Sequence, residues 1–531
     1  MRLQKDDMPN PTDDQITRLV PTLERRSRAT TRSSTEDFRP QRPGIVERVA
    51  ASRHQLVVGR RGVGKTMLLW RVIEYTEDQG NTAIFIDLEH MRDIPYPDVL
   101  LRLLGRVLNA FRRRLPRRNL GLRRRIKRQA RSLDRLLREP QSFVHSVVER
   151  DSSRRRTGAD ADLRLRSVAG KAGARHEIER IGEQAEIRSS EFERTKISQL
   201  QADAPDIQQL LESVVSALGG WAVLVLDDFY YIPREDQAVV LAYLHQILKG
   251  CNIYLKVGGV RHRMRPYDEG DPPRGLLVPQ DAAEVSLDLT LENYAAAKAF
   301  LEDVLEEICS EADIGLDDLL TYAARDRLVL ASGGVARDYL FVVSHALEAA
   351  SARVGSPQEP RNRITAEDVN RAAPRLREQK DQELALDAGA DSQKLRDRFS
   401  ELVVFCLDTN EVNIFLVEAS DLQETAWGQE IEALAELRFV HRIRNLAIQD
   451  SAYRGRRFQA FALDLSSYSQ SRLERITHIL PDEYGRMRSP NLIYTPDLAN
   501  QRSRERRPVA PESPATESVE EGQPRLFDGN S

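Results

Sequence analysis

Cysteine is scarce in this chain, with only Cys251, Cys309 and Cys406 among 531 residues. These cysteines stand far apart and show no C-x-x-C spacing, so neither a disulfide framework nor a zinc site is predicted. No apolar run approaches the length of a membrane span, and the polar, charged segment from Met1 to Thr35 is unlike a signal peptide. We therefore expect a cytoplasmic protein with no membrane partner.

The chain also has few aromatic residues and almost no net charge. Aromatic residues make up 6% of the chain, and 79 basic residues against 82 acidic ones leave a net charge of −3, so global charge indicates no partner. The hydrophobic fraction of 40% is that of a globular protein, and 531 residues exceed what one core usually serves. We expect two or three domains with polar tails.

The strongest motif follows the short apolar stretch His54–Val58. Residues Gly59 to Thr66 meet the pattern G-x-x-x-x-G-K-[ST] in full, and an apolar helix pattern follows. Glycines let backbone N–H groups converge on phosphate oxygens, and the helix N-terminus adds a positive dipole end. We expect Lys65 to reach the β and γ phosphates of ATP and the Thr66 hydroxyl to ligate Mg²⁺. The predicted cofactor-binding residues are Gly59, Arg60, Arg61, Gly62, Val63, Gly64, Lys65, Thr66 and Met67.

A second apolar strand, Trp221–Leu226, ends in two acids, as a Walker B strand does. Asp227 is expected to hold Mg²⁺, usually through water. Asp228 stands where hydrolytic P-loop proteins commonly place a Glu that activates the attacking water. Because its side chain is one methylene shorter, we expect slow turnover rather than none.

Three further apolar runs, Thr82–Leu88, Asn252–Val257 and Ala283–Asp288, alternate with helical patterns and predict a parallel sheet. Residues 1–38 show no apolar periodicity and are predicted to be flexible. Arg39 to Pro43 precedes the first strand, where many P-loop proteins cover the adenine base; a plain connecting loop is the other interpretation.

The strand Asn252–Val257 is followed by Gly258-Gly259, where a polar sensor would be expected. Arg261 and Arg263 could instead contact a phosphate, in cis or in trans as an arginine finger. Surface or substrate contacts are the alternative. His262 is expected to pack or to cap, since no ligand cluster surrounds it.

The P-loop, Asp227-Asp228, the segment Ser332-Gly-Gly-Val-Ala-Arg337 and the helix Ile364–Ala373 occur in that order. Together they resemble origin-recognition-complex-type AAA+ ATPases of a broad bacterial branch that carries insertions, over roughly residues 40–375 and more loosely 390–480. The resemblance implies that Arg337 is a sensor-two arginine on the γ-phosphate, although it could also be a plain helix start that pairs with Asp338. Three departures from this family bring the chain nearer to STAND-type switch ATPases: Asp228 in place of Glu, Gly258-Gly259 in place of a polar sensor, and the basic insertion.

A basic block runs from Arg112 to Arg131 without a single acid. Such a block binds DNA or another polyanion by counterion release. Apolar residues at helical spacing follow from Leu133, so a solvated basic face or a protein contact is the competing interpretation. No interleaved aromatic residues support base stacking.

The C-terminal third is similar to the winged-helix domain that follows the lid in this family. We expect a helix over Glu430–Arg442 in this domain. A predicted hairpin would place Arg454–Arg457 at its wing, to follow a phosphate backbone or to contact a protein. The tail from Pro481 is predicted to be disordered. Its segment Gln523–Phe527 resembles the Gln-x-x-Leu-Phe peptides that dock on the replication sliding clamp.

The predicted fold class is α/β, a P-loop NTPase (AAA+-like) parallel-sheet core with a helical insertion, a helical lid and a winged-helix-like C-terminal domain. The boundaries are 1–38 for the flexible segment, 39–289 for the core with its insertion at about 112–203, 290–378 for the lid, 390–480 for the winged-helix-like domain and 481–531 for the tail. The expected function is an ATP-dependent, slowly hydrolysing switch that controls DNA binding or assembly as an oligomer. The alternative is a signalling or defence ATPase that binds protein partners without DNA.

Overall fold

The computed structural model describes residues 11–27, 38–92, 94–157, 170–353, 362–388, 391–443, 455–468 and 492–499, except for the side chains of 139–157, 170–191 and 386–388. A five-stranded parallel sheet forms the core, with strand order β2-β3-β4-β1-β7. Its strands are β1 (Gln55–Val58), β2 (Thr82–Asp87), β3 (Ala222–Asp227), β4 (Ile253–Gly259) and β7 (Ala283–Ser286). Because β1 lies between β4 and β7, the loop that follows β1 emerges near the middle of the sheet.

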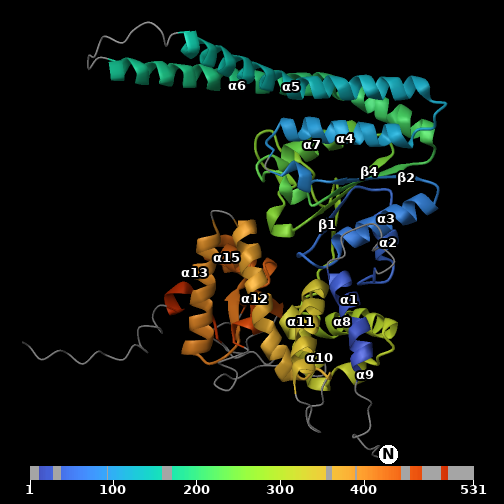
Figure 1. Cartoon of the computed structure of the whole chain (residues 1–531), viewed down its shortest axis with the longest axis vertical. Helices are drawn as coiled ribbons and strands as arrows, with labels where there is room; N and C mark the ends of the chain where they lie inside the picture. Colours follow the sequence, from blue (N-terminus) through green and yellow to red (C-terminus); the bar gives the residue numbers. More distant parts are fainter. Residues whose placement is uncertain are drawn as a thin grey trace, which may run out of the picture.

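Helices cover both faces of this sheet (Figure 1). The helices α2 (Ile45–Ala50) and α3 (Lys65–Asp78) pack on one face, where Val57, Ala83 and Val223 point. The helices α4 (Asp98–Arg114) and α7 (Gln237–Leu248) pack on the other face with Leu56 and Leu224. Successive strand residues thus serve opposite faces, which explains why these strands are continuously apolar. A short hairpin of β5 (Tyr267–Asp268) and β6 (Arg274–Gly275) follows β4.

The long insertion between β2 and β3 forms two helices, α5 (Leu120–Thr157) and α6 (Gly170–Leu218). Figure 1 shows them side by side, projecting far beyond the core. The base of this hairpin is packed: Ile126 and Leu133 of α5 and Leu200 of α6 are buried in the same cluster as α4. The basic block therefore lies on helices that pack against the sheet core.

The lid follows β7 and is wholly helical. Its helices are α8 (Tyr294–Glu311), α9 (Leu316–Leu319), α10 (Tyr322–Ser332), α11 (Ala336–Ala352) and α12 (Ala366–Ala388). Thr365 caps α12, because its hydroxyl oxygen accepts from the Asp368 N–H at 3.4 Å, while its own backbone N–H donates to Asp368 Oδ2 at 2.8 Å.

The structure corrects the prediction of a flexible segment over residues 1–38. Residues Asp13–Ser27 form helix α1, which packs on α8 and α11 of the lid. Leu19 and Leu23, one turn apart, are fully buried in the lid core, and Arg26 pairs with Glu307 and Glu311. Two leucines at helical spacing in a polar segment were too weak a signal to predict this docking.

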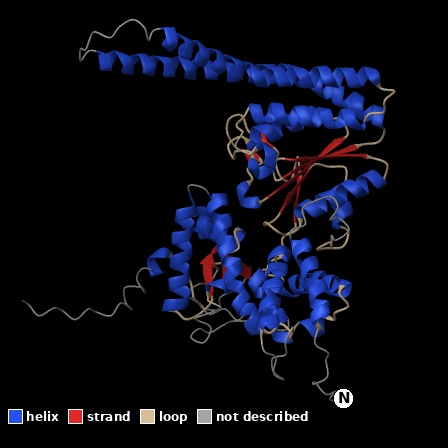
Figure 2. Cartoon of the chain, viewed as in Figure 1, coloured by secondary structure: helices blue, strands red, loops and turns tan. Residues whose placement is uncertain are grey.

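The C-terminal domain has the connectivity of a winged-helix-like fold, helix, strand, two helices and a hairpin. Its elements are α13 (Ser392–Val403), which continues as a π-helical segment (Val404–Thr409), β8 (Ile414–Glu418), α14 (Ala419–Glu424), α15 (Ala426–Glu436), β9 (Val440–Ile443) and β10 (Phe458–Leu463), in a sheet of order β8-β10-β9. Figure 2 shows this second, smaller sheet apart from the core sheet.

Two predictions for this domain were wrong. The helix expected over Glu430–Arg442 ends at Glu436, and Arg438, in a left-handed conformation (φ 69°), turns the chain into β9. The tail expected to be disordered from Pro481 returns to the domain at residues 492–499, where Ile493 bridges to Leu416 and Tyr494 is fully buried. The predicted fold class itself is confirmed. Among the described residues, no helix is both long and apolar enough to cross a membrane.

Candidate nucleotide-binding site

The glycine-rich loop connects β1 to α3 and has the backbone geometry that its motif requires. Gly62 (φ 81°) and Gly64 (φ 93°) adopt left-handed conformations that other residues rarely tolerate. The lid also approaches here, since a Cβ at Gly62 would lie 2.8 Å from the Cβ of Arg337. Gly62 thus serves both the loop conformation and the contact with the lid.

Lys65 is buried and folded back over this loop. Its Nζ donates to the carbonyl oxygens of Gly59 at 2.8 Å and Arg60 at 3.0 Å. Burial lowers the pKa of Lys65, and the nearby carboxylates of Asp228 and Asp227 oppose that shift. Neutral carbonyls compensate a buried ammonium only in part, so an anionic phosphate group is a fitting further partner.

Thr66 and Asp227 form the candidate metal site. The Thr66 hydroxyl donates to Asp227 Oδ2 at 2.7 Å, which brings the start of α3 against the end of β3. Burial, followed by the charge of Asp228, raises the pKa of Asp227 to about 6. A hydroxyl and a carboxylate are the hard oxygen donors that Mg²⁺ prefers, and the charge of the ion would favour the ionised form of this buried acid.

Asp228 follows at the edge of the same cavity in a left-handed conformation (φ 53°). Non-glycine residues in this region are strained by about 1–3 kcal/mol and cluster at functional sites. Burial raises the pKa of Asp228, with Lys65 as the main opposing charge. A raised pKa suits a general base. Asp228 also begins the turn η3 (Phe229–Tyr231), which places Tyr230 beside Arg61. The Arg61 Nη2 donates to the phenol oxygen of Tyr230 at 3.3 Å.

Gly258, next to the last residue of β4, is a glycine for a steric reason. A Cβ at Gly258 would lie 2.7 Å from Asp227 Oδ1 and 2.8 Å from Leu69 Cδ1. There is no room for a polar sensor side chain here, because Asp227 occupies that space. None of the residues that line the cavity comes from β4.

Arg60, a predicted cofactor-binding residue, turns its side chain away from the cavity. Its guanidinium pairs with Asp288 at 3.3 Å and donates to the carbonyl oxygens of Leu289 at 2.8 Å and Gly333 at 3.1 Å. Gly333 begins the connection to the lid helix α11. Arg60 therefore joins the P-loop to the lid, a role that the motif alone did not reveal.

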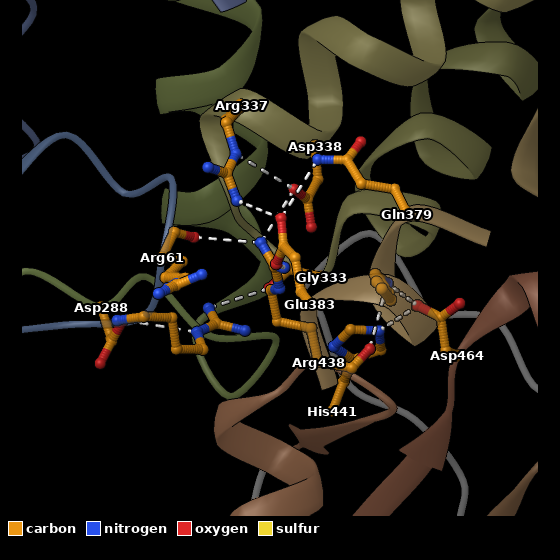
Figure 3. Close-up of polar contacts among 12 residues, drawn as sticks. Arg61, Asp288, Gly333, Arg337, Asp338, Gln379, Glu383, Arg438, His441 and Asp464 are labelled. Atoms are coloured by element: carbon orange, nitrogen blue, oxygen red, sulfur yellow. Dashed lines mark hydrogen bonds and ion pairs between the residues drawn. The ribbon is translucent and has the colours of Figure 1, made fainter. Parts of the chain in front are cut away.

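Arg337 lies where the lid meets the loop, as the sensor-two assignment requires. Its backbone N–H donates to the Gly62 carbonyl at 3.3 Å, and it lines the cavity together with Lys65 and Thr66. Its Nη2 donates to Glu383 Oε1 at 3.0 Å (Figure 3). Glu383, on α12, is a partner that no sequence pattern indicated.

Arg261 and Arg263 do not line this cavity. Arg261, in the turn η4 (Arg261–Arg263), pairs with Glu284, whereas the guanidinium of Arg263 lies 4.6 Å from the ring centre of Tyr230. The assignment of Arg261 to a phosphate contact stays a prediction, and only a contact in trans is compatible with this placement. His262 is half-buried, its pKa lowered to about 4 by burial and nearby arginines.

The cavity has a volume of about 830 Å³, within the range of small-ligand sites. Loop residues 61–67, Asp228 and Arg337 supply polar lining, and Phe38, Phe300, Phe341 and His345 supply aromatic lining, with the rings of Phe341 and His345 4.2 Å apart. Polar and aromatic groups together fit the phosphates and the base of a nucleotide. Arg39 and Gln41 also line the cavity, and their assignment to an adenine site stays a prediction. Glu24, Arg26 and Ser27 at the end of α1 line it as well, which sequence reasoning missed.

The basic block presents an exposed surface on the other side of the core. Arg114 pairs with Glu77, but the described residues include no ion-pair partner for Arg124, Arg125 or Arg128. A second cavity of about 800 Å³ lies between α4 and α5, and its basic lining residues are Arg102, Arg106, Arg112, Arg113, Lys127 and Arg131.

The remaining predicted contact residues lie elsewhere. At the predicted wing, Arg456 pairs with Glu418 and Arg454 is outside the described residues. The clamp-like segment Gln523–Phe527 is also outside them.

Comparison with known proteins gives distant structural neighbours. No protein-family model matches the chain, and no curated protein matches it. The Orc1 protein of Aeropyrum pernix, solved in complex with DNA, shares 14% identity at a TM-score of 0.32, covering 82% of this chain and 92% of its own. Cdc6p of Pyrobaculum aerophilum shares 13% identity at a TM-score of 0.31, covering 80% of this chain and 92% of its own. A RuvB mutant of Thermotoga maritima shares 10% identity at a TM-score of 0.27, covering 74% of this chain and 76% of its own. These similarities are too low to carry an argument about the activity of this chain.

Proposed function

We propose that this protein is a Mg·ATP-dependent switch ATPase of the AAA+-like class that hydrolyses slowly and whose nucleotide state controls binding to DNA. One observation carries the proposal: Lys65 and Thr66, Asp228 and Arg337 come from three distant parts of the chain and line one cavity, and Thr66 donates to Asp227 beside it. Loop, Walker B acids and lid arginine are the parts that phosphoryl transfer from ATP requires.

Each part has a distinct task. The loop N–H groups and Lys65 would hold the phosphates, and Thr66 and Asp227 would hold Mg²⁺, which neutralises charge between the β and γ phosphates. Asp228 would orient the attacking water and accept its proton. Because its carboxylate reaches less far than a glutamate would, slow turnover is expected, as suits a switch more than a motor.

The DNA contact is assigned to the basic surface at the base of the α5–α6 hairpin. Arg124, Arg125 and Arg128 are exposed on α5 and have no acidic partner among the described residues. An unpaired guanidinium loses no ion pair when it binds a phosphate, and each such contact releases a counterion from the nucleic acid. The tightly packed base of the hairpin links this surface to the ATPase core through α4.

The test for the ATPase is a hydrolysis assay with and without DNA. Lys65→Ala should abolish nucleotide binding, because the buried ammonium of the loop, which would contact the phosphates, is removed. Asp228→Asn should retain nucleotide binding and stop turnover. Hydrolysis by Asp228→Asn at the parent rate would show that Asp228 is not the base.

The test for the DNA contact is the salt dependence of binding. Replacing Arg124, Arg125 and Arg128 with alanine should weaken binding to all sequences and reduce the slope of log K against log salt by about 1 for each lost phosphate contact. Arg138→Ala is a matched control, since Arg138 is also exposed on α5 but pairs with Asp134 at 3.1 Å. Nucleotide-dependent assembly without any salt-sensitive DNA binding would instead favour a protein partner.

A further inference from the structure

We propose that Glu383 is a positioning residue that holds the lid arginine Arg337 away from the γ-phosphate position, so that a nucleoside triphosphate must compete with this carboxylate for Arg337. This inference rests on the proposed function, since it concerns how the same site distinguishes ATP from ADP.

The first step is the placement of Glu383. It lies on α12 and is 15% exposed, and its Oε1 accepts from Arg337 Nη2 at 3.0 Å and from Gln379 Nε2 at 3.2 Å. Although burial favours the neutral acid, Arg438 and Arg337 keep the pKa of Glu383 below its ordinary value. Glu383 is therefore an ionised, oriented acceptor for the lid arginine.

The second step is the residue that fixes Glu383. Arg438 of the winged-helix-like domain pairs with the other oxygen, Oε2, and its side chain is only 3% exposed. The same guanidinium donates to Asp338 Oδ1 at 3.0 Å and to the P-loop carbonyl of Arg61 at 3.2 Å (Figure 3). With Oε2 occupied and the guanidinium of Arg438 fixed by two other elements, the carboxylate cannot easily turn away from Arg337.

The third step is the incomplete pairing of Arg337. Its Nε is buried and has no hydrogen-bond partner within the described residues, although Asp338 Oδ1 lies 4.0 Å away as an ion-pair partner. This nitrogen lies against the loop, since a Cβ at Gly62 would be 2.9 Å from it. Only one end of the guanidinium is thus satisfied by Glu383, while an unsatisfied donor lies beside the loop that cradles phosphates. A third phosphate group would offer that donor an acceptor and a stronger charge.

Competition follows from these contacts. Arg337 can direct its guanidinium either to Glu383 or to a terminal phosphate, and the triphosphate alone provides the latter. Breaking the Glu383 contact should therefore improve ATP binding and leave ADP binding nearly unchanged.

The experiment compares dissociation constants for ADP and the non-hydrolysable analogue AMP-PNP, with Mg²⁺, in the full chain. Glu383→Gln should raise the preference for the triphosphate about tenfold, and Glu383→Asp, which keeps the charge, should restore most of the parent preference. In an Arg337→Ala background, Glu383→Gln should change nothing, because the residue that it positions is gone. Asp381→Asn, which removes an acid of α12 that pairs with Arg377 at 2.9 Å, is the matched control and should leave the preference unchanged.

Equal preference in the parent and in a folded Glu383→Gln variant would overturn the inference, as would the same gain in the Arg337→Ala background. A parent protein that binds neither nucleotide would instead overturn the proposed function itself. The two failures are therefore distinguishable.

Discussion

Gly258 offers a direct test of how the end of β4 is built. Gly258→Ala adds one methyl group at a position where its carbon would lie 2.7 Å from Asp227 Oδ1 and 2.8 Å from Leu69 Cδ1. Neither neighbour can yield easily. Asp227 Oδ1 accepts from the Asp228 N–H at 3.0 Å, its Oδ2 accepts from Thr66, and Leu69 is fully buried.

The expected cost follows from these distances. Overpacking by one methyl group in a filled site costs about 1–3 kcal/mol of unfolding free energy. Displacement of Asp227 should also weaken Mg²⁺-dependent nucleotide binding, so two readouts should change together. The backbone at Gly258 is not left-handed, so the effect is steric rather than conformational.

The assays are urea unfolding and nucleotide titration with and without Mg²⁺. Gly105→Ala is the control, since Gly105 lies inside α4 with no atom within 4 Å of the added carbon and should gain up to about 1 kcal/mol in helix propensity. A Gly258→Ala protein as stable as the parent, with unchanged Mg²⁺ dependence, would refute this account of why the sensor position is a glycine.

Two further predictions concern the metal site and the N-terminal helix. The pKa of Asp227 is raised from 3.8 to about 6 on folding, so the folded state retains its proton more strongly, and the stability of the metal-free protein should fall as pH rises from about 4 to about 6 and then level off. At 1.36 kcal/mol per pKa unit, this shift changes the free energy of unfolding by about 3 kcal/mol. Asp227→Asn should remove the pH dependence, as measured by urea unfolding across that range. An unchanged slope of unfolding free energy against pH would mean that another group titrates. Leu23→Ala should destabilise the lid by about 2–5 kcal/mol, because Leu23 is fully buried there. Ile16→Ala, at the partly buried edge of the same core, should cost less. If thermal unfolding shows equal and negligible losses of stability for both variants, α1 does not contribute to the lid core.

Much of the core could be predicted from the sequence because its signals are local. A strand, a glycine loop and a helix occupy consecutive residues, and the apolar run before Asp227 and Asp228 leads directly into the acids. The parallel sheet, the helical insertion and the lid helices followed from the same short-range periodicity. The boundary errors, at the helix that ends at Glu436 and at α1, arose where two or three buried residues decide the structure.

The succession of strand, glycine loop and helix, and the strand that ends in Asp227, follow from the sequence alone, since backbone conformation and strand burial depend on neighbouring residues. Their surroundings follow only from the packing of the whole chain. Three contacts join segments that lie far apart in the chain: Arg60 with Gly333, Gly258 with Asp227 and Leu69, and Arg337 with Glu383. Such contacts depend on how whole elements pack, which no local pattern of residue types encodes.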